Sequence, residues 1–167
     1  MAEEQGLLKH AQALLNWARE KGLAVLHFVY SFRKDFSDVP ANSSLYRVLK
    51  EAGAFVVGSW GAQIIESVQP MESERVIAKP RIGAFVGTSL DEFLRSRGIE
   101  TLILGGLTTN WVIESTARQA IDLGYHLVAV EDCMASFSRE LHDFAIRQIY
   151  PQISTVVRVE DLLRLPV

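Results

Sequence analysis

Residues 100–132 read ETLILGGLTTNWVIESTARQAIDLGYHLVAVED and contain the pattern that decides the fold. The apolar run at 100–106 ends in two glycines and the run at 126–132 is equally apolar, which predicts two strands covered on both faces. Between them, residues 110–123 have helical periodicity, and Gly124 is expected to end this helix. A strand, a helix and a second strand in this order predict a parallel βαβ unit.

The same alternation of strands and helices continues on both sides of this unit. The chain as a whole has five expected strands with helices between them. This pattern predicts one α/β domain over residues 1–167, a Rossmann-like three-layer sandwich with a mostly parallel sheet. Strands are expected at 23–31, 75–79, 100–106, 126–132 and 153–159, and helices at 5–21, 44–52, 88–98, 110–123, 138–150 and 160–165.

Two of the expected helices carry specific boundary signals. Thr88 or Ser89 is expected to be the N-cap of the helix at 88–98, and Ser89 with Glu92 has the spacing of a capping box. Pro151 is expected to end the helix at 138–150. The buried face of that helix is predicted to contain Leu141, Phe144, Ala145 and Ile149.

Composition bounds the class of protein. The formal charge is -3 and the pI is about 5.8, so the chain has no basic footprint for nucleic acid or for an anionic membrane. The sequence holds no run of about 18 apolar residues, so no membrane span is expected. The acidic N-terminus is unlike a signal peptide, and the single Cys133 cannot form an internal disulfide. A cytoplasmic protein with a small-molecule substrate is the expectation.

The residues that could perform chemistry lie after the expected strands. Ligands of open parallel sheets bind beyond the carboxyl ends of the strands. Lys79 ends one strand, residues 106–110 end the next, and Asp132 and Cys133 end the one after it. The backbone N–H groups that open the helix at 110–123 could bind an anion or an oxyanion.

Each of these residues also has a plain structural interpretation. Lys79 could be a solvated surface lysine, and Thr109 or Asn110 could be an N-cap. Asp132 could cap the following turn, and Cys133 could be a small buried apolar side chain. The histidines have no metal-ligand spacing and phosphate-binding glycine motifs are absent, so no metal and no cofactor are expected.

Three longer motifs add a resemblance to a known family. They are KPRIGAFVGTSL at 79–90, GLTTNWVIESTARQA at 106–120 and GYHLVAVED at 124–132, and GSWGAQIIESVQP at 58–70 supports them. Together they resemble the isochorismatase-like hydrolase superfamily, and the wording TTNWVIESTAR is most similar to an uncharacterised enterobacterial branch of it.

This resemblance implies a site built from an Asp, a Lys and a Cys nucleophile. The Lys corresponds to Lys79, and the family's non-proline cis peptide would join Leu107 to Thr108. The oxyanion donors would be the N–H groups of Thr108 and Val112, and Thr109 and Asn110 complete the substrate-binding turn.

The nucleophile position corresponds to Val112, which has no reactive group. Cysteine-type amidase chemistry is therefore not expected, and neither Ser115 nor Thr108 has an evident base beside it. Isochorismatases also lack this Cys and have Gly there, since vinyl ether hydrolysis requires a proton donor.

A second difference concerns the catalytic Asp. In the family it lies on a strand reading roughly ALLVIDMQ, which precedes the first helix and should lie near the middle of the sheet. The 167 residues do not contain this strand, so the sheet is expected to lack it. Truncation of the sequence, a replacement by another segment or subunit, and a degenerate family member all remain open. Asp35 and Asp38 follow the strand at 23–31 and are alternative candidates.

Two interpretations of function follow. The first is an isochorismatase-like hydrolase that acts on a small molecule through Lys79 without a covalent intermediate. The second is a non-catalytic binding or structural member that keeps the fold and the cleft. In either case the family resemblance implies a homodimer or a higher homo-oligomer.

Overall fold

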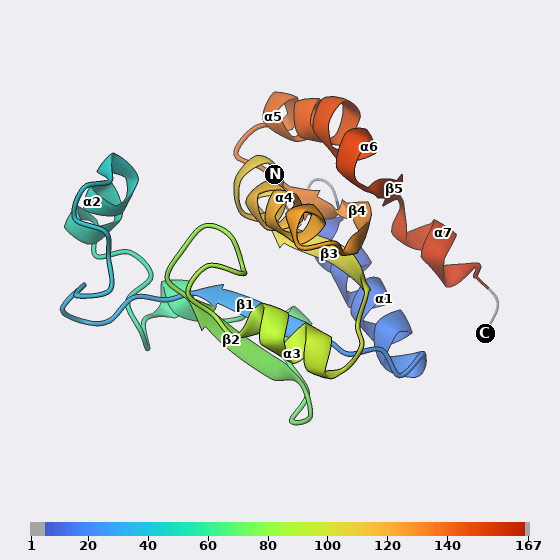
Figure 1. Ribbon diagram of the computed structural model, residues 1–167, viewed down its shortest axis with the longest axis horizontal. Helices are drawn as coiled ribbons and strands as arrows, with labels where there is room; N and C mark the ends of the chain where they lie inside the picture. The colour runs from blue at the N-terminus through green and yellow to red at the C-terminus, as the bar shows by residue number, and fades with distance from the viewer. Residues whose placement is uncertain (1–5, 166–167) are drawn as a thin grey trace.

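The computed structural model describes residues 6–165, and they form the three layers expected of an α/β domain, with parallel strands in the middle and helices on both faces (Figure 1). The elements in chain order are α1 (Leu7–Glu20), β1 (Leu26–Tyr30), α2 (Ser44–Glu51), η1 (Trp60–Ala62), η2 (Glu66–Val68), β2 (Arg75–Lys79), α3 (Leu90–Ser96), β3 (Thr101–Leu107), η3 (Thr109–Ile113), α4 (Glu114–Asp122), β4 (His126–Ala135), α5 (Arg139–Phe144), η4 (Ala145–Ile149), α6 (Tyr150–Ile153), β5 (Thr155–Val157) and α7 (Val159–Leu163).

The strands form two parallel sheets instead of the single sheet expected. One sheet has the order β1-β2 and the other has the order β3-β4-β5. Both run in the same direction, because α1 starts beside Asp132 near the carboxyl end of β4 and ends beside Glu74 at the amino end of β2. Within residues 6–165, β1 and β3 are not hydrogen-bonded to each other, so a break separates the two sheets at this point.

The core lies on both faces of the larger sheet. One cluster packs α3, α4 and α6 on the sheet through side chains such as Leu94, Ala117 and Tyr150. A smaller cluster packs α1 and α7 on the opposite face through Trp17 and Leu162. Burial of these apolar side chains is the main favourable contribution to folding.

The prediction that β1 and β3 are buried on both faces is wrong. All five residues of β1 are only half-buried, and β3 consists of half-buried and exposed residues, none of them fully buried. By contrast, β4 has a neighbour on each side, and Ala129 and Val130 in it are fully buried. The exposure of β1 and β3 follows from their position at the two edges of the break.

Three boundary predictions also need correction. Ser89 precedes α3, but its side chain makes no capping hydrogen bond, and Thr88 Oγ1 accepts from the Leu90 N–H instead. Pro151 lies in the first turn of α6, where a helix tolerates proline, so it does not end the helical segment. Leu141 and Phe144 are exposed, and the buried face contains Ala145, Ile146 and Tyr150.

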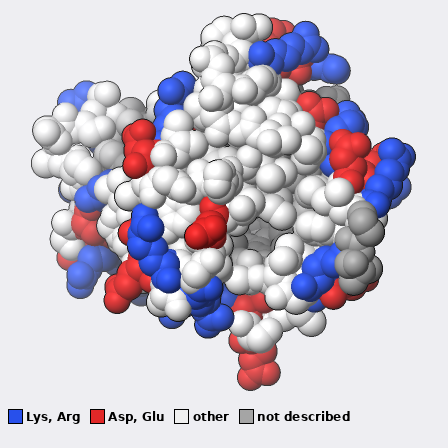
Figure 2. Space-filling view, turned by 45° about the vertical axis from the view of Figure 1, so that its right-hand side comes forward, with Lys and Arg blue, Asp and Glu red and all other residues white. Residues whose placement is uncertain are grey.

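One face of the surface appears in Figure 2. Acidic and basic side chains are interspersed around its rim, and uncharged side chains fill the middle around a hollow. Within residues 6–165, no helix is both long enough and apolar enough to cross a bilayer.

Candidate active site

Lys79 ends β2 with a buried ammonium group. The residue is 2% exposed, and desolvation by burial lowers the pKa of its amine from 10.5 to about 8. Its Nζ donates to the carbonyl oxygens of Arg81 (2.8 Å) and Ile82 (2.9 Å) and lies 4.1 Å from the centre of the Tyr30 ring. No carboxylate of the described residues lies within 4.0 Å of this nitrogen, so its charge is held by backbone dipoles and a ring face.

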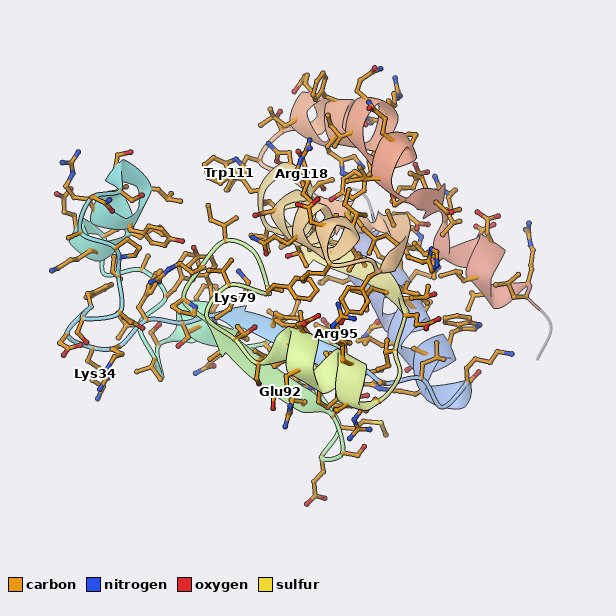
Figure 3. All side chains as sticks on the ribbon, in the orientation of Figure 1. Lys34, Lys79, Glu92, Arg95, Trp111 and Arg118 are labelled. Atoms are coloured by element: carbon orange, nitrogen blue, oxygen red, sulfur yellow. The ribbon has the colours of Figure 1, made fainter. Side chains whose placement is uncertain are left out.

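The loop after β2 carries these carbonyl groups and is fixed at both ends. Arg81 donates to the carbonyl oxygen of Asp38 (2.8 Å), which ties the loop to the segment after β1. The Ala84 N–H donates to Thr116 Oγ1 (3.1 Å), which ties it to α4. Figure 3 shows Lys79 on the same side of the molecule as Trp111, toward the side that carries α2.

The turn between β3 and α4 forms the second part of the site. The Leu107–Thr108 peptide bond is cis, as the family resemblance implied. The Thr108 carbonyl accepts from the N–H groups of Trp111 (3.3 Å) and Ile113 (3.1 Å). Among the backbone hydrogen bonds that join different elements or loops of the described chain, none has the N–H of Thr108 or Val112 as donor.

Thr109 and Asn110 hold this turn against the end of the sheet. Thr109 is fully buried, its Oγ1 is hydrogen-bonded to His142 Nδ1 (2.8 Å), and its carbonyl accepts from the Tyr150 hydroxyl (2.9 Å). Asn110 Oδ1 accepts a hydrogen bond from Ser136 Oγ. Neither side chain caps the helix, because Thr108 occupies the N-cap position and makes no side-chain cap bond, so the N-cap interpretation is wrong.

Neither Val112 nor Cys133 presents a reactive nucleophile. Val112 is half-buried and packs against the main core cluster. Cys133 is 2% exposed in the cluster beneath α1, and burial raises the pKa of its thiol to about 12. The Cys133 sulfur therefore stays protonated at neutral pH, and a thiol is a poor nucleophile.

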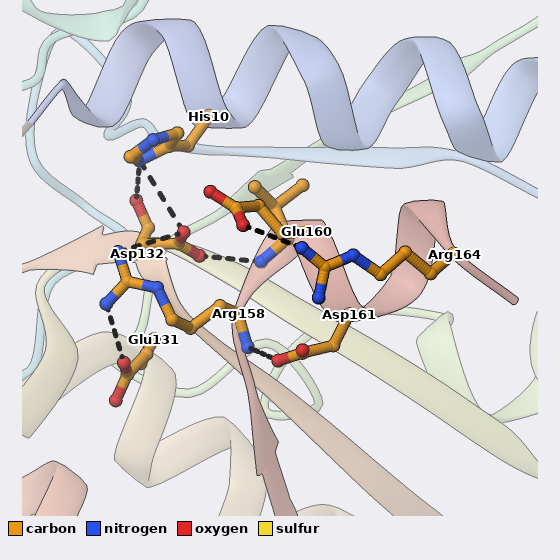
Figure 4. Close-up of polar contacts among 8 residues, drawn as sticks. His10, Glu131, Asp132, Arg158, Glu160, Asp161 and Arg164 are labelled. Carbon is orange, nitrogen blue, oxygen red and sulfur yellow. Dashed lines mark hydrogen bonds and ion pairs between the residues drawn. The ribbon is translucent and has the colours of Figure 1, made fainter.

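The candidate aspartates Asp35, Asp38 and Asp132 all accept hydrogen bonds from other residues. Asp35 accepts from Ser37, and Asp38 accepts from the Arg33 N–H. Asp132 Oδ1 accepts from the Val159 N–H (2.9 Å) at the start of α7, and its backbone carbonyl accepts from His10 (3.2 Å) in α1 (Figure 4). Asp132 therefore joins three elements, which supports the structural interpretation.

Sequence reasoning missed the residues that support the site. Tyr30, His142, Tyr150 and Ser136 come from four different segments, and nothing in their local spacing marks them.

A cavity of about 530 Å³ lies elsewhere, at the amino ends of β1 and β2, and its lining includes Glu74, Arg75 and Phe93. The chemistry-bearing residues therefore gather at the carboxyl ends of the strands, away from this cavity. No group of three metal-ligating side chains occurs among residues 6–165.

Comparisons with known proteins agree with this architecture. Residues 1–161 match the isochorismatase domain family. The uncharacterised isochorismatase family protein YecD of Escherichia coli O157:H7 is 47% identical over 92 residues, which cover 55% of this chain and 49% of that protein. The ureidoacrylate amidohydrolase RutB of Rhizobium rhizogenes is 26% identical over 172 residues, which cover 93% of this chain and 70% of that one.

Solved structures extend the similarity to the whole fold. An isochorismatase family protein from Desulfovibrio vulgaris superposes with a TM-score of 0.85 at 32% identity and covers 96% of this chain and 85% of its own. The N-carbamoylsarcosine amidase of Thermoplasma acidophilum gives a TM-score of 0.77 at 26% identity, with 96% and 86% coverage. The chain spans about half the length of the first curated relatives, 49% and 54%. The match over residues 1–161 and the shared fold show that the chain belongs to the isochorismatase family.

Proposed function

We propose that the chain is a hydrolase that acts on a small molecule at the carboxyl ends of β2 and β3, without a cysteine nucleophile. The observation that carries this proposal is the buried cation of Lys79 on the same side of the molecule as Trp111, which follows the turn with the cis peptide (Figure 3). Its family includes hydrolases, and two similar proteins are named as an amidohydrolase and an amidase.

The chemistry follows from the groups at hand. Lys79 is mostly protonated at neutral pH, because its pKa is about 8. An ammonium with a pKa near the working pH can stabilise developing negative charge or donate a proton. The N–H groups of Thr108 and Val112 would bind the oxyanion that forms when water adds directly to an amide carbonyl. The bond from carbon to the leaving nitrogen then breaks and the leaving amine takes a proton, so no covalent enzyme intermediate forms. A vinyl ether or an amide is the bond class that these groups fit.

The test is hydrolysis of a panel of small vinyl ethers and amides, followed by chromatography and mass spectrometry. The wild-type protein is compared with Lys79→Ala and with Lys34→Ala, which removes an exposed lysine from the loop after β1. We expect Lys79→Ala to abolish turnover and Lys34→Ala to leave it unchanged. Unchanged turnover in a folded Lys79→Ala protein would remove Lys79 from the mechanism.

A second candidate function is binding without conversion. It is favoured by the lack of a carboxylate within 4.0 Å of the Lys79 nitrogen in the described chain, since the family's reaction needs an acid–base partner there. A compound that raises the melting temperature through Lys79 but is never converted would support this function over hydrolysis.

A further inference from the structure

His142 lies on α5 and contacts the turn that contains the proposed oxyanion donors. The helix packs against η3 and β4. The Nδ1 atom of His142 lies 2.8 Å from Thr109 Oγ1, although the two residues are 33 positions apart in the chain. Thr109 is fully buried and directly follows Thr108, whose N–H is one of the proposed donors. His142 therefore reaches the turn from a separate helix, through one hydrogen bond.

The direction of this hydrogen bond follows from the burial of Thr109. Within residues 6–165, Thr109 Oγ1 has one hydrogen-bond partner, which is the Nδ1 atom of His142. A buried hydroxyl group needs an acceptor for its hydrogen, so the Thr109 hydroxyl donates to Nδ1. The hydrogen of the neutral imidazole then lies on Nε2.

Burial keeps the imidazole of His142 neutral. Desolvation lowers the pKa of the ring below 6.5, and Asp143 and Glu131 act in the opposite direction. Both carboxylates already form ion pairs with arginine side chains, which are Arg139, Arg147 and Arg158. The segment η3 has no charged side chain. His142 is therefore mostly neutral at pH 7 and can accept the Thr109 hydrogen.

The position of Thr109 determines the position of the neighbouring N–H groups. Its carbonyl accepts from the Tyr150 hydroxyl (2.9 Å), and Ser136 is hydrogen-bonded to the next residue, Asn110. The side chain of Thr109 is fixed by His142. An oxyanion donor must lie about 2.7–3.1 Å from the oxygen that it binds, and a displacement of about 1 Å can lower a rate about 100-fold. Loss of the His142 contact therefore removes one of the restraints that oxyanion binding requires.

We infer that His142 is a positioning residue, which acts through Thr109 and holds the turn at 108–112 so that its N–H groups can bind an oxyanion. The inference rests on the proposed function, because it concerns the same site. Protonation of the imidazole reverses the hydrogen bond, since Nδ1 then donates and the Thr109 hydroxyl loses its acceptor. Activity should therefore fall as the pH decreases through the pKa of His142, which is below 6.5.

The kinetic test compares kcat, KM and the pH profile of four proteins on a compound that the wild type hydrolyses. His142→Asn keeps an acceptor for the Thr109 hydroxyl but does not titrate, and His142→Leu has no acceptor. His126→Asn is the matched control, because it removes an exposed histidine at the start of β4. We expect His142→Leu to lower kcat about 10- to 100-fold and to change KM less than about threefold. We expect His142→Asn to retain kcat within about threefold and to lose the decrease in acid, and His126→Asn to match the wild type.

A double-mutant cycle tests whether His142 acts through the Thr109 hydroxyl. Thr109→Val removes the hydroxyl, so combining it with His142→Leu should lower kcat no further than either change alone. Additive losses would overturn the inference, as would a wild-type kcat in His142→Leu. An unchanged decrease in acid in His142→Asn would also overturn it, and this variant decides the question if His142→Leu does not fold.

An NMR titration separates this inference from the proposed function. Between about pH 4.5 and about pH 8, the amide signals of residues 108–112 should follow the titration of the His142 ring in the wild type and in His126→Asn. In His142→Asn these signals should not follow such a titration. Amide signals that stay constant while the ring titrates would overturn the inference, whether or not the protein is a hydrolase. If the signals follow the ring but no compound is hydrolysed, the proposed function fails and the positioning contact is retained.

Discussion

The replacement Lys79→Met should change how stability depends on pH. Lys79 is 2% exposed, and burial lowers the pKa of its amine from 10.5 to about 8. The folded state therefore releases this proton at a lower pH than the unfolded state. The resulting stability is fully present above pH 10.5 and is lost as the pH falls through about 8. Linkage gives a gain of about 2 kcal/mol in the free energy of unfolding between about pH 7 and about pH 9.5.

The assay is urea unfolding at several pH values for the wild type, Lys79→Met and Lys34→Met. The tyrosines titrate in both proteins, so their contribution cancels when the free energy of unfolding of Lys79→Met is subtracted from that of the wild type. We expect the wild type to gain about 2 kcal/mol relative to Lys79→Met over this range, and Lys34→Met to follow the wild type. Parallel pH curves for the wild type and Lys79→Met would refute a desolvated Lys79. A constant offset is expected in any case, since methionine cannot donate to the two carbonyl groups.

Three further predictions concern other parts of the molecule. Because burial raises the pKa of the Cys133 thiol to about 12, iodoacetamide should alkylate it only after unfolding, and rapid alkylation of the native protein would contradict its burial. Glu74→Gln should lower the free energy of unfolding at pH 7 by about 1–3 kcal/mol, since its pKa of about 2 reflects arginine and histidine partners. This contribution is present above pH 4.5 and is lost as the pH falls toward 2, so the two proteins should converge in acid urea titrations. We propose that copies of the chain associate through exposed apolar side chains that include Phe137 (73% exposed) and Phe144 (61%). Serine at both positions should reduce association in sedimentation velocity, and an unchanged oligomer would place the interface elsewhere.

Hydrophobic periodicity predicted those helices and strands well whose boundaries depend on nearby residues alone. The strand at 75–79 and the helix at 44–51 appear almost as expected, because apolar periodicity and turn residues determine both. The capping box at Ser89 failed because of a neighbouring residue. The Thr88 hydroxyl donates to the Ala84 carbonyl and accepts from the Leu90 N–H at the start of α3.

Burial of the strands could not be read from the sequence, since it depends on which strands become neighbours. An apolar run such as Leu26–Tyr30 predicts a strand covered on both faces, yet this strand is only half-buried and lies beside the break between the two sheets. Only the family resemblance implied a break beside this strand, because hydrophobic periodicity does not say which strands pair with each other.

The candidate site also has one part that was predicted and one part that was not. The resemblance located Lys79 and the cis peptide at Leu107–Thr108, and it matched Val112 to the nucleophile position. It did not predict that His142 and Tyr150 hold Thr109, because these contacts join residues more than 30 positions apart.

The most direct test of the central claim is the pH dependence of kcat/KM for any compound that the protein hydrolyses. A protonated Lys79 in the site predicts that kcat/KM falls about tenfold per pH unit above the lysine pKa, which is about 8. It also predicts that this fall is absent in Lys79→Arg if that variant is active. A wild-type rate that stays constant from about pH 7 to about pH 9.5, across the lysine pKa, would contradict the proposed role of Lys79.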